Sequence, residues 1–289
     1  MDISSLAAFT AVAREASFSN AADCLYVTQP AVSKRVAGLE QELGVELFHR
    51  VARRVSLTEA GRQLLPKAVE LINQAEDMKR YAASLGDEIS GSLSVALSHH
   101  VGLHRMPPVF HQFNKRFPEV SLDLRFEDSD QALENVEQGN IEFAVITLPK
   151  IVPKQLKMES IWLDPLHLVA APDHDLFTSN VLSIETLLDY PCVLTEQSTQ
   201  TYNVVARALE NANQLLNIRM QTNNLESLKM MVSVGLGWSA LPSTMLDDSI
   251  KTLPLNVRLR RELGMVFHRQ RSLSNAAKAL VRLIRQSPR

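Results

Sequence analysis

The chain has 289 residues, 45% of them hydrophobic, so it is long enough for two or three packed domains and too apolar to be disordered. Its formal net charge of -2 does not by itself indicate a nucleic-acid partner, and acidic and basic residues nearly balance in the first sixty positions too. Two distant cysteines exclude a disulfide framework. We see neither a signal pattern nor a bilayer-spanning apolar run, so we expect a cytoplasmic protein with no membrane partner.

Two helices are predicted at the start of the chain. The first follows from five apolar residues at helical spacing, Ile3, Leu6, Phe9, Val12 and Ala13, and should close a small core. The second is short and covers 19–25, with Ser19 as its cap and Phe18 packed on its first turn. Only a tight connection at 26–27 then separates it from the next helix.

A third helix is predicted between Thr28, which suits the capping position, and Gly44, which suits the end. Its buried stripe is formed by Val32, Val36, Leu39 and Leu43. Away from the stripe, the first turns present short, hydrogen-bonding or positively charged side chains: Gln29, Pro30, Ser33 and Lys34. A helix that buries one side and offers such residues at its N-terminal end can read base edges in a major groove. Two short helices so joined form the helix-turn-helix pattern.

A small strand is predicted after the third helix, because Val55 and Leu57 alternate with polar residues. Arg50, Arg53 and Arg54 lie on the hairpin before it and would form a wing that contacts phosphates or a minor groove. The alternative at this point is an ordinary helical bundle with a solvated, charged face.

A long helix is predicted from Thr58 to about Leu85. Its apolar residues repeat every four and three positions over three heptads: Leu64, Ala68, Leu71, Ala75, Met78, Ala82 and Leu85. Such a helix spans roughly 40 Å, and its narrow seam predicts pairing with a second copy of itself. The alternative is that the seam packs on its own domain. Pro66 should kink or loosen the helix locally.

Beyond a predicted hinge at 86–91, strands alternate with helices, which favours a parallel α/β sheet. The predicted strands are 93–97, 120–126, 143–146, 166–170, 192–194, 218–221, 238–241 and 264–268. The predicted helices are 107–117, 131–138, 184–188, 202–211, 225–234 and 274–284. The best division of this part is one lobe at about 92–162 plus 266–289 and another at about 163–265.

Ligands of open α/β sheets bind beyond the carboxyl ends of strands, where helix N-termini gather. That rule selects three loops, 98–102, 147–149 and 196–201, which are rich in hydroxyls, amides and imidazoles. The predicted effector-binding residues are Ser98, His99, His100, Val101, Thr147, Leu148, Ser198, Thr199, Gln200 and Thr201, with Trp238 as a wall of the pocket. The ligand should be a small polar or anionic molecule. The alternative is that these residues are only caps and turns.

The N-terminal residues resemble the signature of LysR-type transcriptional regulators. The motifs that carry the resemblance are Ser19-x-Ala21-Ala22, Thr28-Gln29-Pro30-Ala31-Val32-Ser33, Leu39-Glu40-x-x-Leu43-Gly44, Leu47-Phe48-x-Arg50 and Leu57-Thr58-x-Ala60-Gly61. They are ordered and nearly continuous over about sixty residues.

The resemblance implies a multidomain α + α/β protein. A winged helix-turn-helix would occupy 1–58, a linker and dimerisation helix 59–88, and a two-lobed effector domain similar to periplasmic binding proteins 92–289. The predicted DNA-binding residues are Ser19, Asn20, Thr28, Gln29, Pro30, Ser33, Lys34, Arg35, Arg50, Arg53 and Arg54. Lys34 stands where the family often has arginine, which would lose bidentate guanine recognition.

The resemblance also implies partners. They are double-stranded promoter or operator DNA, a small-molecule effector, and further copies of the chain, which pair through the linker helix and commonly form a tetramer in this family. An activator would also contact RNA polymerase. Peroxide-sensing members use two nearby cysteines in the second lobe, whereas this chain has only Cys192 there.

We predict no catalytic residue, metal or cofactor. His99, His100 and His104 have no cysteine or well-placed carboxylate to complete a zinc site, and no nucleophile elbow or phosphate loop is found. Both cysteines should be buried packing residues, and the C-terminal arginines, Arg261 among them, should be solvated. The alternative function is an α/β small-molecule-binding or catalytic domain fused to a helical protein-interaction module.

Overall fold

The computed structural model describes residues 1–51, 54–83, 89–178, 182–209 and 216–288. The chain divides into two compact units, Met1–Asp87 and Glu88–Arg289, and each is described by itself. The first half of the predicted hinge at 86–91, residues 86–88, lies outside the described residues.

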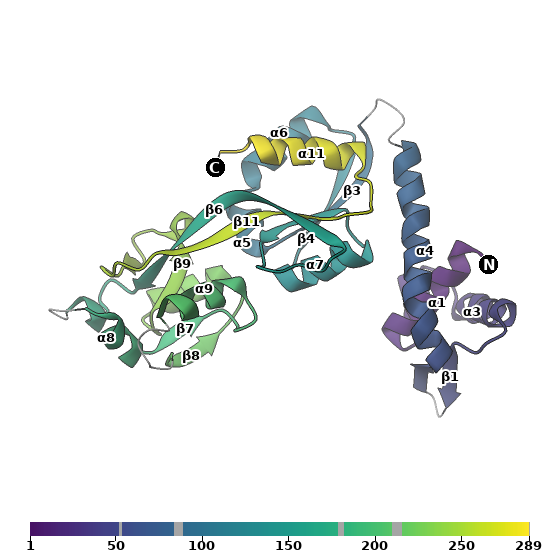
Figure 1. Cartoon of the computed structure of the whole chain (residues 1–289), viewed down its shortest axis with the longest axis horizontal. Helices are drawn as coiled ribbons and strands as arrows, with labels where there is room; N and C mark the ends of the chain where they lie inside the picture. Colours follow the sequence, from purple (N-terminus) through teal and green to yellow (C-terminus); the bar gives the residue numbers. More distant parts are fainter. Residues whose placement is uncertain (52–53, 84–88, 179–181, 210–215, 289) are drawn as a thin grey trace. The chain divides into compact units, whose positions relative to one another are not determined.

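The N-terminal unit is a winged helix-turn-helix followed by one long helix (Figure 1). Its elements are α1 (Ile3–Glu15), α2 (Phe18–Cys24), α3 (Gln29–Leu43), β1 (Phe48–Val51), β2 (Arg54–Leu57) and α4 (Glu59–Ala83). All of these elements contribute to one core, in which Phe9, Val36 and Leu39 are almost completely buried. Cys24 is exposed at the end of α2, so the expectation that it is buried is wrong.

The helix ends follow local capping chemistry. Asp2 caps α1 by accepting a hydrogen bond from the Ser5 amide over 2.7 Å. Ser17, and not Ser19 as predicted, caps α2, because its Oγ accepts from the Asn20 amide over 3.2 Å; Phe18 is therefore inside the helix. Gly44 ends α3 with φ +70°, a conformation that favours glycine.

Hydrogen bonds between side chains and backbone groups hold the wing against the helices. Glu40 of α3 accepts from the Leu47 amide over 2.8 Å and from the Phe48 amide over 3.3 Å, which fixes the start of β1. Thr58 accepts from the Gly61 amide over 2.9 Å and donates to the Glu46 carbonyl over 2.6 Å. A Cβ on Gly61 would lie 2.2 Å from the Leu47 carbonyl oxygen, so only glycine allows this approach. These signature residues therefore position the wing.

The long helix α4 has 25 residues and continues through Pro66. Its predicted seam has two different environments. Leu64 and Ala68 pack into the N-terminal core, whereas Leu71 and Met78 are 39% and 70% exposed. None of the described helices is both long and apolar enough to cross a bilayer.

The second unit contains a seven-stranded sheet and a two-stranded sheet. The large sheet has the order β10-β6-β11-β5-β3-β4, with β9 paired to β6, and β7 pairs with β8 in the small one. The strands are β3 (Gly91–Leu97), β4 (Val120–Phe126), β5 (Phe143–Thr147), β6 (Leu156–Ala170), β7 (Cys192–Leu194), β8 (Ile218–Gln221), β9 (Ser239–Pro242), β10 (Lys251–Thr252) and β11 (Leu259–His268).

The prediction of a wholly parallel sheet is wrong. The pairs of β3 with β4 and β5, and of β7 with β8, are parallel, but β11 runs antiparallel between β5 and β6. Strands β9 and β10 also run antiparallel to β6. The sequence pattern marked most of these strands as extended, with β10 and the first part of β6 missed, but carried no information on their direction.

The helices of this unit are α5 (His99–His104), α6 (Pro107–Arg116), α7 (Ser129–Gln138), α8 (Ile184–Asp189), α9 (Gln200–Leu209), α10 (Leu225–Ser233) and α11 (Asn275–Gln286). Short 3-10 turns lie at Asp175–Phe177 and Ser243–Met245. The short helix α5 was not predicted; it occupies the loop expected after β3.

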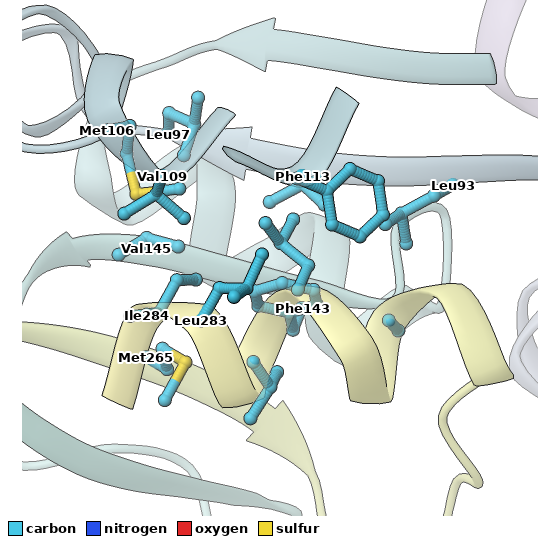
Figure 2. Packing of buried hydrophobic residues seen from close by; sticks show 14 of the residues in the cluster. Leu93, Leu97, Met106, Val109, Phe113, Phe143, Val145, Met265, Leu283 and Ile284 are labelled. Atoms are coloured by element: carbon cyan, nitrogen blue, oxygen red, sulfur yellow. The ribbon is translucent and has the colours of Figure 1, made fainter. Parts of the chain in front are cut away.

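Two of the hydrophobic clusters in this unit are joined by its longest strands. In the first cluster, α6 and α11 pack on β3, β5 and β11, as Figure 2 shows for Phe113, Phe143 and Met265. The second cluster surrounds Leu194, Val205 and Trp238. Strands β6 and β11 contribute to both clusters, so two crossing strands connect them.

Strand β6 begins ten residues earlier than predicted, because we took Asp164-Pro165 as a break. Pro165 lacks an amide hydrogen but still stands in register with Arg260 of β11. Asp164, next to it, is completely buried and stands opposite Arg261. A charge inside a strand is tolerated here because its partner is the cross-strand neighbour.

Candidate functional site

The N-terminal end of α3 is exposed while the opposite side of the helix is buried. Val32, Val36 and Leu39 are fully buried in the core. Thr28, Gln29, Pro30 and Lys34 are exposed, and Ser33 and Arg35 are half-buried. The Gln29 amide donates to Ser33 Oγ over 3.0 Å, which holds the two side chains together at the helix tip. The amide keeps its carbonyl oxygen and one N–H, the pair that recognises adenine.

Several acidic residues of the N-terminal unit are engaged in contacts within that unit. Glu40 binds backbone amides, Glu42 pairs with the Met1 amino group, and Glu15 pairs with Arg14. Lys34 and Arg35, in contrast, make no ion pair within the described parts of the chain. Both charges therefore remain available to a polyanion.

The remaining predicted DNA-binding residues lie on α2 and the wing. Ser19 and Asn20 are exposed on the first turn of α2. The backbone of Arg50 belongs to β1 and that of Arg54 to β2, so both arginines are on strands that flank the hairpin tip. Arg53 lies outside the described residues.

In the second unit, most of the predicted effector residues line one cavity of about 310 Å³. They come from the three expected loops and are Ser98, His99, His100, Thr147, Ser198, Thr199, Gln200 and Thr201. Loops that are 50 to 100 residues apart in sequence are thus brought to one place by the parallel neighbours β5, β3 and β4, in that order, and by the N-terminus of α9. A cavity of this size suits a small molecule.

Three predicted effector residues do not line the cavity. Trp238 is fully buried in the second cluster, where its Nε1 donates to the Tyr190 carbonyl over 3.2 Å, so it is a core residue and not a pocket wall. Val101 is fully buried in the first cluster, on the inward side of α5. Leu148 packs beside β5 in a separate small cluster. All three are apolar, and packing explains each of them.

Sequence reasoning missed the charged residue at the floor of the cavity. Arg261 of β11 was expected to be solvated, but it is only 6% exposed and lines the cavity. Its Nε donates to Asp164 over 2.9 Å and its Nη1 donates to Thr201 Oγ1 over 2.6 Å. Arg105, the residue that follows α5, contacts the other oxygen of Asp164 over 3.3 Å. Two guanidinium groups therefore share one buried carboxylate.

These contacts decide whether the Asp164 carboxyl group is ionised. Burial alone would raise the pKa of Asp164, but the approach of His100 and the charge of Arg261 outweigh it and hold the pKa at about 2. His100 Nε2 lies 3.6 Å from Asp164, which is longer than a normal hydrogen bond. Burial lowers the pKa of His100, so its imidazole is neutral near pH 7.

Four carboxylates at the edge of the cavity were also missed. Asp128, Asp130 and Glu134 come from the start of α7, and Glu196 follows β7; all four are exposed. The signal that could have found Asp128 and Asp130 is the rule that selected the other loops, because 127–131 follows β4 at the same edge of the sheet. Asn223 donates to Asp128 over 3.1 Å and to Glu196 over 3.3 Å, and so bridges segments from both sides of the cavity.

The histidines do not form a metal centre with their neighbours. His100 and His104 have ring centroids 4.9 Å apart, and His104 pairs with Glu226 of α10 over 2.7 Å. Among the described residues, no group of three or more His, Cys, Asp or Glu is arranged to hold a metal ion. Cys192 is buried, which raises the pKa of its thiol to about 12 and keeps it protonated.

Comparison with known proteins decides the family. A model described as the LysR substrate binding domain matches residues 86–289, and one described as the bacterial regulatory helix-turn-helix protein of the lysR family matches residues 3–62. The chain belongs to the LysR family of transcriptional regulators. A LysR regulator with these two domains binds DNA and carries an effector-binding domain, and it is not an enzyme. The catalytic alternative raised by the sequence is thereby excluded.

Relatives of this LysR regulator cover nearly its whole length. An uncharacterized HTH-type transcriptional regulator of Shigella flexneri, YfeR, is 30% identical over 97% of this chain and 92% of its own. A probable RuBisCO transcriptional regulator of Synechocystis is 29% identical over 94% of this chain and 82% of its own.

Solved structures share the fold at lower identity. A full-length OxyR variant from Pseudomonas aeruginosa superposes with a TM-score of 0.73 at 22% identity, covering 99% of this chain and 95% of its own. Full-length CbnR, solved in complex with its target DNA, gives a TM-score of 0.67 at 19% identity over the whole of both chains. The expected fold, with an N-terminal helix-turn-helix and a C-terminal mixed α/β substrate-binding domain, is confirmed.

Proposed function

We propose that this LysR regulator reads promoter DNA with the N-terminal end of α3 and responds to a small polar or anionic effector bound in the cavity beside Arg261. The division of labour would be 1–58 for DNA binding, 59–88 for dimerisation and 92–289 for the effector, with lobes at about 92–162 plus 266–289 and at 163–265. The observation that carries the effector part is the convergence of eight predicted residues on one cavity.

DNA recognition would be divided among three elements. Gln29, Pro30 and Ser33 of α3 face base edges, Lys34 and Arg35 contribute positive charge, and Thr28 with Ser19 and Asn20 of α2 contacts the backbone. Arg50, Arg53 and Arg54 of the wing bind phosphates or a minor groove. This assignment is supported by the exposure of the α3 tip and by two cations, Lys34 and Arg35, that form no ion pair with the residues the structure describes.

Control by the effector would act through closure of the two lobes. The contacts between Asn223 and Asp128 and between His104 and Glu226 join elements from both sides of the cavity, so a ligand that alters them changes the lobe angle. Copies paired through α4, and commonly four in this family, would transmit that change to DNA bending and to access by RNA polymerase. A ligand can act in this way only if it binds the open and the closed arrangement of the lobes with different affinities.

Footprinting on the DNA upstream of the chain's own gene tests the first part. Ser33→Arg places a bulky guanidinium at the helix tip and should abolish the specific footprint while leaving the oligomer mass unchanged. The matched control is Gln41→Arg, which adds the same group at an exposed position near the other end of α3. A footprint that survives Ser33→Arg, or that is lost equally with Gln41→Arg, contradicts the assignment of α3.

Ser98→Ala tests the second part. The Ser98 Oγ is buried and has no hydrogen-bond partner among the described residues, so its removal should leave thermal stability unchanged or raise it slightly. It should weaken binding of small acids found in a thermal-shift screen. Ligands that bind Ser98→Ala as tightly as the unmodified chain do not occupy this cavity.

A further inference from the structure

The charges around the cavity are arranged in two opposite groups. We propose that the effector is a zwitterion, a small amino acid whose carboxylate meets the cavity floor at Arg261 and whose ammonium group meets the acidic rim. This inference rests on the proposed effector function and specifies the ligand class of the same site.

The buried side chains at the floor of the cavity, Arg261 and Ser98, leave hydrogen-bonding groups free for one anion. Arg261 is 94% buried, and its Nη2 atom has no hydrogen-bond partner among the described residues, although its Nε and Nη1 atoms are both engaged. The Oγ of Ser98, which lines the same cavity, is also buried without a partner. Unsatisfied buried donors are costly, and a carboxylate oxygen would satisfy both.

The charge count of the floor agrees with a single carboxylate. Arg261 and Arg105 share Asp164, and His100 is neutral, so these four side chains sum to a charge of +1; Arg105 is partly buried and lies behind the residues that line the cavity. The N-terminus of α9, which begins at Gln200 on the cavity wall, adds partial positive charge in the same place. One negative charge on a ligand would balance the floor, and two would exceed it.

The rim is negative and unbalanced. Asp128, Asp130, Glu134 and Glu196 are exposed, and none of them forms an ion pair with a cation of the described residues. Their one polar partner in common is the neutral amide of Asn223, which binds Asp128 and Glu196. The N-terminus of α7 offsets only about half a charge, so most of the four negative charges remain. A second carboxylate would be repelled here, whereas an ammonium group would be attracted.

The positive floor is buried and the negative rim is exposed, and this difference sets the orientation of the ligand. Arg261, Thr147 and Thr201 are buried, and the four carboxylates are exposed around them. A zwitterion would therefore enter with its carboxylate first. Dicarboxylates and simple carboxylic acids each satisfy only the floor.

Calorimetry on the full chain tests this inference with the twenty common L-amino acids, β-alanine and γ-aminobutyrate. For each amino acid that binds, the matched probes are its N-acetyl derivative, which lacks the ammonium group, and its decarboxylated amine; succinate represents dicarboxylates. We expect at least one amino acid to bind, and every matched probe to bind at least about tenfold more weakly.

Rim variants provide an independent measurement. The double variant Asp130→Asn, Glu134→Gln changes two exposed groups that hold no ion pair among the described residues, so the fold should be unaffected. It should weaken amino-acid binding about tenfold and leave binding of the N-acetyl derivative unchanged or stronger. Ser98→Ala, in contrast, should weaken both ligands.

The outcomes separate this inference from the proposed function. If N-acetyl amino acids or succinate bind as tightly as any amino acid, or the rim variant binds amino acids normally, the zwitterion is wrong while the effector cavity stands. If no amino acid binds, but another small acid binds and Ser98→Ala weakens that binding, the zwitterion is again wrong and the effector cavity stands. If Ser98→Ala changes the binding of no ligand, both proposals fail.

Discussion

Asp164 of β6 and Arg261 of β11 stand directly opposite each other, and Arg261 Nε donates to Asp164 Oδ2 over 2.9 Å. Their side chains are 0% and 4% exposed, so neither charge is hydrated. Asp164→Asn should therefore lower the free energy of unfolding by about 3–5 kcal/mol, because it leaves a buried guanidinium without its counter-charge. Chemical denaturation followed by the fluorescence of Trp162 and Trp238 measures this.

The matched control is Glu159→Gln, on the same strand. Glu159 pairs with Arg285, but the two side chains are 37% and 51% exposed. Exposed pairs contribute little, so the variant should cost less than about 1 kcal/mol. Equal losses for the two variants would mean that burial of the Asp164 pair has no energetic consequence.

The lowered pKa of Asp164 predicts how the stability of the second unit changes at acid pH. The folded pKa of Asp164 is about 2, against an ordinary 3.8, so folding favours its ionised form. That contribution, about 2 kcal/mol, is complete above the ordinary value and is lost as the pH falls from about 4 to 2. His100 adds an earlier loss, because its lowered pKa makes the unfolded chain take up a proton below the ordinary value of 6.5 while the folded chain does not.

Urea unfolding between pH 8 and pH 3 should therefore show a decline that begins near pH 6.5 and steepens below pH 4. His100→Gln should remove part of the first stage and Asp164→Asn part of the second. If the fall in stability near pH 6.5 is identical in the unmodified chain and in His100→Gln, the assignment of His100 as neutral in the folded chain is refuted.

Two glycines in helices should respond to alanine with opposite signs. At Gly61 of α4, the added Cβ would lie 2.2 Å from the Leu47 carbonyl, so Gly61→Ala should destabilise the N-terminal unit by about 1–3 kcal/mol. At Gly38 of α3, nothing lies within 4 Å of the added Cβ, so Gly38→Ala should stabilise by up to about 1 kcal/mol. Hydrogen exchange in peptides from 29–83 measures both, and stabilisation by Gly61→Ala would show that the close approach is absent.

The sequence was informative wherever a signal is local. The strand Val120–Phe126 was predicted with its observed bounds, because turn residues bracket an apolar stretch. The tip of α3 and the three loops were found by spacing and by the position of loops after strands. Signals of this kind need only neighbours in the chain.

Features that depend on pairing across the fold were missed. Asp164 was predicted to lie in a break before a strand, and Arg261 was predicted to be solvated. Each charge is improbable in a core without the other, which lies 97 positions away in the chain. Trp238 was assigned to the pocket because a large aromatic residue suits a wall and a core equally well. Strand direction was missed for the same reason, since β11 meets β5 and β6 only in the folded sheet.

The exposed part of the α4 seam predicts how copies of the chain associate. Leu64 and Ala68 are used by the N-terminal core, which leaves Leu71 and Met78, 39% and 70% exposed, for a second α4. Met78→Glu would bury an unpaired carboxylate in such a pair, so light scattering should show dissociation to lower mass. Gln63→Glu adds the same charge on an exposed position of α4 outside the seam and should leave the mass unchanged. An oligomer that tolerates Met78→Glu does not assemble through this seam, and its subunits must then pair through the second unit.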